Sequence, residues 1–139
     1  MPDKANQVLI IDDSFLMRRI LTSIMEQSSL FNVCGEASDG IDALEKLSNL
    51  QPDLILLDIE MPRMGGIEFL RLAGMLTDAK VIVVSSVANL DSPQAKEALE
   101  LGAIDIIHKP SGVLSLDMEQ ARAAELLAVM EKAVATSYA

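Results

Sequence analysis

The sequence has 139 residues, of which half are hydrophobic, and its 21 acidic and 11 basic residues give a formal net charge of −10. The apolar content excludes a disordered chain, and the negative charge argues against direct binding to nucleic acid or to an anionic membrane. No apolar run approaches the ~20 residues that cross a bilayer and the start lacks the layout of a signal peptide, so we expect one cytoplasmic domain over residues 1–139.

Short apolar runs alternate along the chain with segments in which apolar residues recur at helical spacing. Proline and glycine mark several boundaries: Pro52 follows the second helical segment, Ser92 and Pro93 begin the fourth, and Gly102 ends it. The strands are expected at residues 7–12, 31–37, 53–58, 80–85 and 103–109. The helices are expected at residues 14–26, 39–50, 66–76, 93–101 and 117–134.

The order of these elements predicts the fold class. Five strand-then-helix units indicate a parallel sheet, because parallel crossovers need a helix between strands. The runs VLII, LILL and VIVV do not alternate with polar residues, which is typical of strands buried on both faces. The sequence therefore predicts an α/β fold, with one five-stranded parallel sheet covered by helices on both faces.

Four of the five predicted strands end in a polar or charged side chain. Taken singly, such a residue is more typical of a turn, a helix cap or a solvated surface. Ligands of open parallel sheets, however, bind at the carboxyl ends of the strands, and acids gathered there repel one another unless a cation or proton neutralises them. The strand-end residues are Asp12 and Asp13, Asp58, Ser85 and Lys109.

The chemistry of this residue set points to phosphoryl transfer. Carboxylates are hard oxygen ligands that favour Mg²⁺. A hydroxyl from Ser85 and an ammonium from Lys109 could hold phosphoryl oxygens. The carboxylate of Asp58 could itself be the nucleophile and form an aspartyl-phosphate, with positioning and charge neutralisation supplying the catalysis. This hypothesis gives Asp58 a function that capping does not.

Four segments in order, "DDSFLMRRIL", "DLILLDIEMPRMGGIEFL", "VIVVSS" and "LGAIDIIHKP", resemble the receiver domain of two-component response regulators. The resemblance implies a flavodoxin-like sheet with strand order 2-1-3-4-5. It also implies a phosphorylated switch that accepts its phosphoryl group from a sensor histidine kinase or phosphotransfer protein and then changes its protein partner. Beyond its own phosphorylation and dephosphorylation, no enzyme activity is implied.

The resemblance assigns roles by position to the strand-end acids. Asp58 resembles the phosphoacceptor, and Asp12 and Asp13 resemble the acidic pair that binds the metal. The backbone carbonyl of Glu60 would be a further ligand. The implied cofactor is Mg²⁺, or Mn²⁺ in its place.

The other positions include two departures from the family pattern. Ser85 matches the switch hydroxyl and Lys109 the lysine that contacts the phosphoryl group, and the family usually has a cis bond after this lysine, here before Pro110. The family's switch aromatic is replaced by Ile106, and an aspartate common before the third helix is replaced by Gly65. These departures affect how a signal would reach the surface more than the chemistry.

A narrower resemblance links "EMPRM", "VVSSV" and "HKPSGVLSLD" to the receiver half of chemotaxis protein-glutamate methylesterases. Those proteins carry a C-terminal hydrolase domain, for which the sequence shows no room and no G-x-S-type nucleophile turn. The chain is then a free-standing receiver or an excised regulatory half. Two alternatives stay open: a phosphorylation-independent adaptor, suggested by Ile106, and a nucleotide or flavin binder, disfavoured because the acids would repel a phosphate.

A histidine, a pair of arginines and a valine also receive predicted positions. The only histidine, His108, is expected on a strand face or partly packed. Arg18 and Arg19 are expected on a solvated face of the first helix, with docking to a kinase as the alternative. Val87 is expected to shield the phosphorylation site from water.

Overall fold

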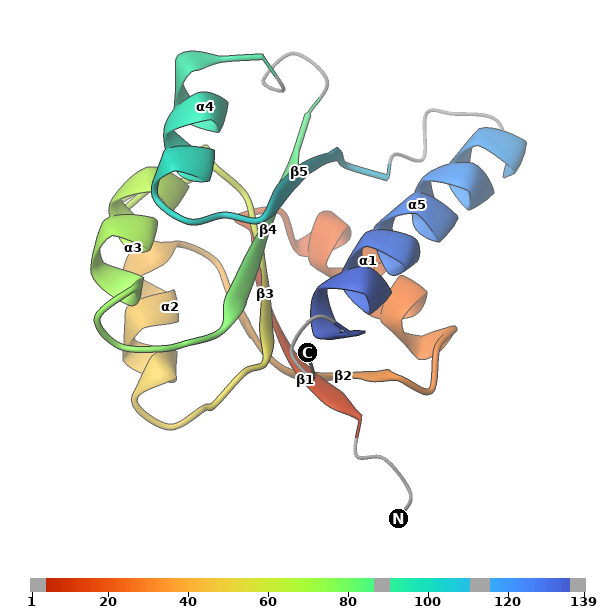
Figure 1. The fold of residues 1–139 in the computed structure, drawn as a ribbon, viewed down its shortest axis with the longest axis horizontal. Helices are drawn as coiled ribbons and strands as arrows, with labels where there is room; N and C mark the ends of the chain where they lie inside the picture. Colours follow the sequence, from red (N-terminus) through yellow and green to blue (C-terminus); the bar gives the residue numbers. More distant parts are fainter. Residues whose placement is uncertain (1–4, 87–90, 111–115, 136–139) are drawn as a thin grey trace.

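A computed structural model describes residues 5–86, 91–110 and 116–135 (Figure 1). Strands and helices alternate along the chain. The strands are β1 Asn6–Ile11, β2 Phe31–Ala37, β3 Leu54–Leu57, β4 Lys80–Ser85 and β5 Asp105–His108. The helices are α1 Phe15–Glu26, α2 Gly40–Leu47, α3 Gly66–Ala73, α4 Pro93–Glu100 and α5 Leu116–Ala135.

All five strands are parallel and form one sheet of order β2-β1-β3-β4-β5, which confirms the predicted fold (Figure 1). Helices α1 and α5 cover one face of the sheet, and α2, α3 and α4 cover the other (Figure 1). The chain leaves β1 toward β2 on one side and returns to β3 on the other side. The carboxyl ends of β1 and β3 therefore flank the point where such sheets bind ligands.

The core consists of two apolar layers separated by the sheet. In β1, Val8 and Ile10 belong to the layer under α1 and α5, while Leu9 and Ile11 belong to the layer under α2, α3 and α4. All four residues of β3 are likewise buried. Because successive side chains of a strand point to opposite faces, a strand covered on both sides needs apolar residues at every position.

Capping chemistry places the ends of α4 where the sequence predicts them. The hydroxyl of Ser92 accepts a hydrogen bond from the N–H of Ala95 at 3.1 Å, and Pro93 opens the helix. Gly102 follows the helix with a φ of 113°, a backbone conformation that glycine adopts without strain, and its N–H donates to the carbonyl of Leu99.

Four elements are shorter than predicted by two residues or more. Helices α2 and α3 end at Leu47 and Ala73, and each continues into tighter turns, as in the bond from the N–H of Leu76 to the carbonyl of Ala73. Strands β3 and β5 stop one residue before Asp58 and Lys109, whose N–H groups still donate to the neighbouring strands. The hydrogen-bonded ladder thus ends at these two residues. Within the described ranges, no helix has both the length and the apolar character of a membrane span.

Candidate functional site

The structure brings together the three acids that directly follow β1 and β3. One carboxylate oxygen each from Asp12, Asp13 and Asp58 lie within 4.8 Å of one another. Asp12 is 1% exposed and Asp58 is 5% exposed, whereas Asp13 faces solvent. Carboxylates this close in a buried setting repel one another, so the cluster needs compensating positive charge.

Lys109 supplies part of that charge. Its Nζ lies 3.2 Å from Oδ2 of Asp12 and 3.2 Å from Oδ2 of Asp58, so one ammonium bridges two strands. Burial opposes the charge of the ammonium, but attraction by Asp58 and Asp12 outweighs it and raises the pKa of Lys109 above its usual value. With three carboxylates and one ammonium ionised, two negative charges stay uncompensated.

The excess of negative charge affects the pKa of Asp58. Burial and repulsion by Asp12 raise the pKa of Asp58 to about 6, although Lys109 acts in the opposite direction. The group is a carboxylate at neutral pH, but in an environment that disfavours its charge. A small divalent cation with oxygen ligands fits this donor set, because it would remove the repulsion that raises the pKa.

Short-range hydrogen bonds fix the turn that carries Asp12 and Asp13. The N–H of Asp12 donates to the carbonyl of Ala37 on β2 at 3.0 Å. Oδ1 of Asp12 accepts the N–H of Ser14 at 2.9 Å, and the hydroxyl of Ser14 in turn accepts the N–H of Met17 and caps α1. The sequence Asp-Asp-Ser thus ends the strand and begins the helix.

The loop after Asp58 returns tightly to β3. The N–H of Gly66 donates to the carbonyl of Ile59 at 2.8 Å, and a Cβ at Gly66 would lie 2.4 Å from the carbonyl oxygen of Asp58. Only glycine allows this approach. Gly65 caps α3 without a side-chain hydrogen bond, as its departure from the family pattern implies. Glu60 lies in this loop with an exposed side chain.

A second anchor of the same loop was not predicted from the sequence. Arg63 has a φ of 63°, which is rare for a residue with a side chain, and its Nε donates to Oδ2 of the buried Asp39 at 2.7 Å. The N–H of Gly40 donates to the carbonyl of Met64 at 2.9 Å. The loop is therefore tied to the start of α2 as well as to β3.

Ser85 ends β4 as predicted and is fully buried. Its Oγ has no hydrogen-bond partner among the described residues, although buried hydroxyl groups are normally paired. Its carbonyl accepts the N–H of Lys109 at 2.8 Å, which links it to the site. An unpaired hydroxyl at this edge of the sheet suits a group that would donate to a ligand.

The remaining predicted positions have mixed outcomes. Ile106 is half-buried and packs against the layer under α2, α3 and α4. His108 is half-buried on β5, and its Nδ1 has no hydrogen-bond partner in the part of the chain that the structure describes. Val87 lies outside the described residues. The implied cis bond is not found: the bond between Lys109 and Pro110 is trans.

The solvated face predicted for Arg18 is wrong. Its side chain is only 16% exposed, and its Nη1 donates to the carbonyl of Asp12 at 2.7 Å. Its Nε lies 2.9 Å from a carboxylate oxygen of Glu36 on β2. Arg19 is 48% exposed and contacts the same carboxylate. The acid at the end of β2 is the signal in the sequence that could have indicated these contacts.

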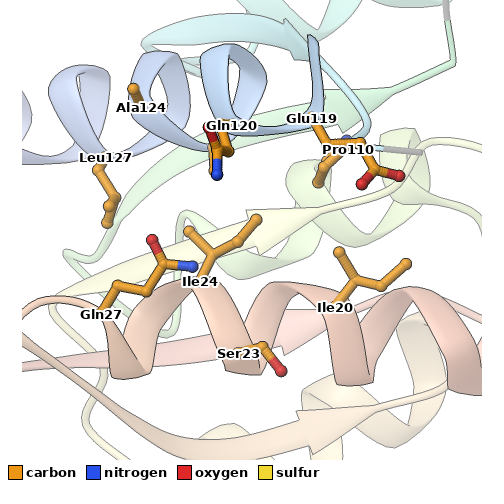
Figure 2. Close-up of a pocket in the computed structure, with 10 residues that line it drawn as sticks. Ile20, Ser23, Ile24, Gln27, Pro110, Glu119, Gln120, Ala124 and Leu127 are labelled. Carbon is orange, nitrogen blue, oxygen red and sulfur yellow. The ribbon is translucent and has the colours of Figure 1, made fainter. Parts of the chain in front are cut away.

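A pocket of about 530 Å³ lies away from the acids, between α1 and α5 (Figure 2). Figure 2 shows Ile20 and Ile24 of α1 facing Gln120 and Leu127 of α5, with Pro110 at one end. Its lining includes none of the three clustered aspartates, and the one carboxylate among the lining residues is that of Glu119. The acidic cluster, and not this pocket, is therefore the candidate functional site.

Sequence comparison relates the chain to a known family. The family model described as response regulator receiver domain matches residues 8–119. A protein-glutamate methylesterase/protein-glutamine glutaminase of Halalkalibacterium halodurans is 45% identical over 116 residues, which are 84% of this chain and 34% of that protein. The corresponding protein of Thermotoga maritima is 42% identical over 134 residues, 96% of this chain and 39% of that protein. The chain spans about a third of the length of these relatives.

Comparison with solved structures also finds response regulator domains. The response regulator domain of Thermotoga maritima CheB matches with a TM-score of 0.81 and 41% identity, covering 93% of this chain and 96% of that one. A crystal structure of the P1 domain of CheA3 in complex with CheY6 from R. sphaeroides matches with a TM-score of 0.79 and 41% identity, covering 96% and 99%. The other two thirds of the methylesterases have no counterpart in these 139 residues. The chain belongs to the response regulator receiver family.

Proposed function

We propose that the chain is a phosphorylation-controlled switch in which Asp58 accepts a phosphoryl group from a histidine kinase or phosphotransfer protein. The observation that carries the proposal is the setting of the Asp58 carboxylate. It is nearly buried at a strand end, an ammonium lies 3.2 Å away, and Asp12 and Asp13 each bring a carboxylate oxygen within 4.8 Å. A turn or capping role does not account for three acids and a lysine converging from three strands.

The acidic cluster would also hold the divalent cation. Asp12, Asp13 and Asp58 are its proposed ligands, with the backbone carbonyl of Glu60 as a further one. Mg²⁺ or Mn²⁺ would supply the charge neutralisation that two uncompensated carboxylates and an incoming phosphoryl group require. The chain itself supplies the nucleophile, the ammonium and the hydroxyl.

The proposed phosphoryl transfer forms one bond to phosphorus and breaks another. A carboxylate oxygen of Asp58 attacks phosphorus and forms a P–O bond while the P–N bond of the donor phosphohistidine breaks. The electron pair of that bond stays on the imidazole nitrogen. Lys109, already within 3.2 Å of Asp58, would face the phosphoryl oxygens. In dephosphorylation, a separate reaction, water attacks phosphorus and inorganic phosphate leaves, while the electrons of the P–O bond to Asp58 return to the carboxylate.

The unpaired hydroxyl of Ser85 suits the switching step. It would donate to a phosphoryl oxygen, and the accompanying shift of β4 would change the surface of α4, β5 and α5 that meets the partner. Ile106 replaces the family's aromatic on β5, so the response there would be a change of packing. We place this switch in the cytoplasm, as one domain in a two-component pathway of the chemotaxis type.

The test is phosphorylation of the purified chain with a small-molecule phosphodonor and Mg²⁺, read by intact mass. The wild type is expected to gain one phosphoryl group, and Asp58→Asn is expected to gain none. Asp78→Asn is the matched control, because Asp78 is an exposed aspartate outside the cluster, and it should be labelled as the wild type is. Equal labelling of wild type and Asp58→Asn would contradict the proposal.

A second candidate is that the chain is the regulatory part of a protein-glutamate methylesterase. The observation that favours it is the identity to such proteins over about a third of their length. Reading the gene beyond codon 139 separates the two candidates. A hydrolase domain in frame would support this one, and an immediate stop codon would contradict it.

A further inference from the structure

Both backbone polar groups of Asp12 are tied to β2, one of them through a side chain. The N–H of Asp12 donates directly to the carbonyl of Ala37. The carbonyl of Asp12 accepts Nη1 of Arg18 at 2.7 Å, and Nε of the same guanidinium lies 2.9 Å from the carboxylate of Glu36. Arg18 is thus the link between β2 and the peptide group that joins Asp12 to Asp13.

This link is better shielded than that of the neighbouring arginine. Arg18 is 16% exposed and Arg19 is 48% exposed. Both guanidinium groups contact Glu36 and both lie 5.5–5.7 Å from the centre of the Phe15 ring. Arg18 alone of the two donates to Asp12. A guanidinium presents its donors in a rigid fork, so it can hold a carbonyl and a carboxylate at a fixed separation.

We propose that Arg18 is a positioning residue that sets the divalent-cation affinity of the acidic cluster. By fixing the peptide plane between Asp12 and Asp13, it fixes the directions in which their two carboxylates leave the backbone. Groups that orient metal ligands without touching the metal commonly change its affinity. The inference rests on the proposed function, because it takes Asp12 and Asp13 as cation ligands.

Removing the Arg18 guanidinium would change the cation affinity in two opposite directions, one through lost charge and one through lost positioning. The two effects can therefore be separated by experiment. Removing a positive guanidinium makes the cluster more negative and strengthens the binding of a cation. Loosening the peptide of Asp12 weakens that binding, because the ligands must then be ordered when the cation enters. Arg18 and Arg19 carry the same charge, so Arg19→Gln measures the effect of charge and Arg18→Gln measures both effects.

The experiment is calorimetric titration of Mg²⁺ into the metal-free full chain. Arg18→Gln is expected to raise the dissociation constant about tenfold. Arg19→Gln is expected to leave it within about twofold of wild type or to lower it. Glu36→Gln, which removes the anchor of Arg18 but not its donors, is expected to fall between the two. A dissociation constant that changes equally in both arginine variants, or that is lower in Arg18→Gln than in Arg19→Gln, would overturn the inference.

A second measurement does not depend on the cation. The N–H of Ser14 donates to Oδ1 of Asp12, so its hydrogen exchange in the metal-free protein reports how firmly that carboxylate is held. Exchange should accelerate in Arg18→Gln, stay unchanged in Arg19→Gln, and recover in part in Arg18→Lys, which restores one donor. If Arg18→Gln does not fold, Arg18→Lys and Glu36→Gln carry both measurements.

The outcomes separate the inference from the proposed function. A wild-type chain that binds no Mg²⁺, or whose labelling does not depend on Asp58, overturns both. A wild type that binds Mg²⁺ and is labelled at Asp58, with Arg18→Gln equal to it in affinity and exchange, overturns the inference alone.

Discussion

The folded protein destabilises the ionised form of Asp58. Burial and Asp12 raise its pKa to about 6, from about 3.9 in an unfolded chain. The folded state therefore binds this proton more tightly than the unfolded state. The stability that the protonated group contributes is fully present below about pH 4 and is lost as the pH rises through about 6. At neutral pH the metal-free chain is thus less stable than its packing would allow.

Asp58→Asn should accordingly stabilise the metal-free protein at neutral pH, because an amide has no charge to bury. We expect an increase of about 1–3 kcal/mol in the free energy of unfolding at pH 7.5, and little change at pH 4. Urea unfolding followed by circular dichroism measures both, since the chain has no tryptophan. A gain of the same size at both pH values would show that the effect is not one of ionisation.

At the scale of elements, the junction between β3 and α3 is set by a contact that no side chain could make. A Cβ at Gly66 would lie 2.4 Å from the carbonyl oxygen of Asp58 and 2.9 Å from Cα of Ile59. Both are backbone atoms, so neither can rotate away. The start of α3 is thereby held directly against the residue proposed to be phosphorylated.

Gly66→Ala should therefore destabilise the chain by about 2–3 kcal/mol, because either the helix or Asp58 has to shift. Gly74→Ala is the matched control. Gly74 has a right-handed φ of −58°, and its nearest neighbour to an added Cβ, the carbonyl of Leu70, is 4.0 Å away. This second variant should be neutral or more stable by about 0.5 kcal/mol. Similar losses in thermal unfolding would refute the role of the close contact.

Helices and strands were predictable from the sequence where neighbouring residues determine their position. The run LILL predicts a strand buried on both faces, and Ser92, Pro93 and Gly102 mark the ends of α4. The contacts of Arg18 and Arg63 were not predictable in this way, because their partners Glu36 and Asp39 lie 18 and 24 positions away. Nothing in the local pattern distinguishes an arginine held by such a partner from a solvated one.

The convergence of the strand-end acids was predictable because topology alone brings the carboxyl ends of parallel strands to one edge. The strand order itself came from the family resemblance and not from any local pattern. One detail, the positive φ of Arg63, depends on packing that short-range rules do not describe. The bond before Pro110 is trans, as the local preference of X-Pro bonds favours, and it was the family resemblance that implied a cis bond.

At the scale of the whole molecule, a cation bound at the cluster should stabilise the entire fold. A ligand that binds only the folded state adds RT ln(1 + [L]/Kd) to the free energy of unfolding, about 2.7 kcal/mol at one hundred times Kd. This corresponds to a rise in Tm of roughly 5–10 °C for a chain of this size. We expect Mg²⁺ to produce it in the wild type and a chelator to reverse it.

Asp12→Asn, which removes a buried proposed ligand, should reduce this Mg²⁺-dependent rise in Tm. Asp78→Asn should leave it intact, because that residue lies outside the cluster. The measurement is a thermal scan of each variant with and without Mg²⁺ at constant ionic strength, so that general screening does not contribute. An equal rise in all three proteins would indicate nonspecific binding to an acidic chain.

The bridge that Lys109 forms between Asp12 and Asp58 has a consequence for how a signal could leave the site. The lysine acts as a built-in counterion, and a divalent cation would offset more negative charge than a phosphoryl group adds to a carboxylate. The cation-bound, phosphorylated cluster would then be nearer to neutrality than the metal-free resting one. A distant surface would feel little change in electric field. We therefore expect a signal to leave the site as a displacement of β4, which ends in Ser85, and of β5, which directly precedes Lys109.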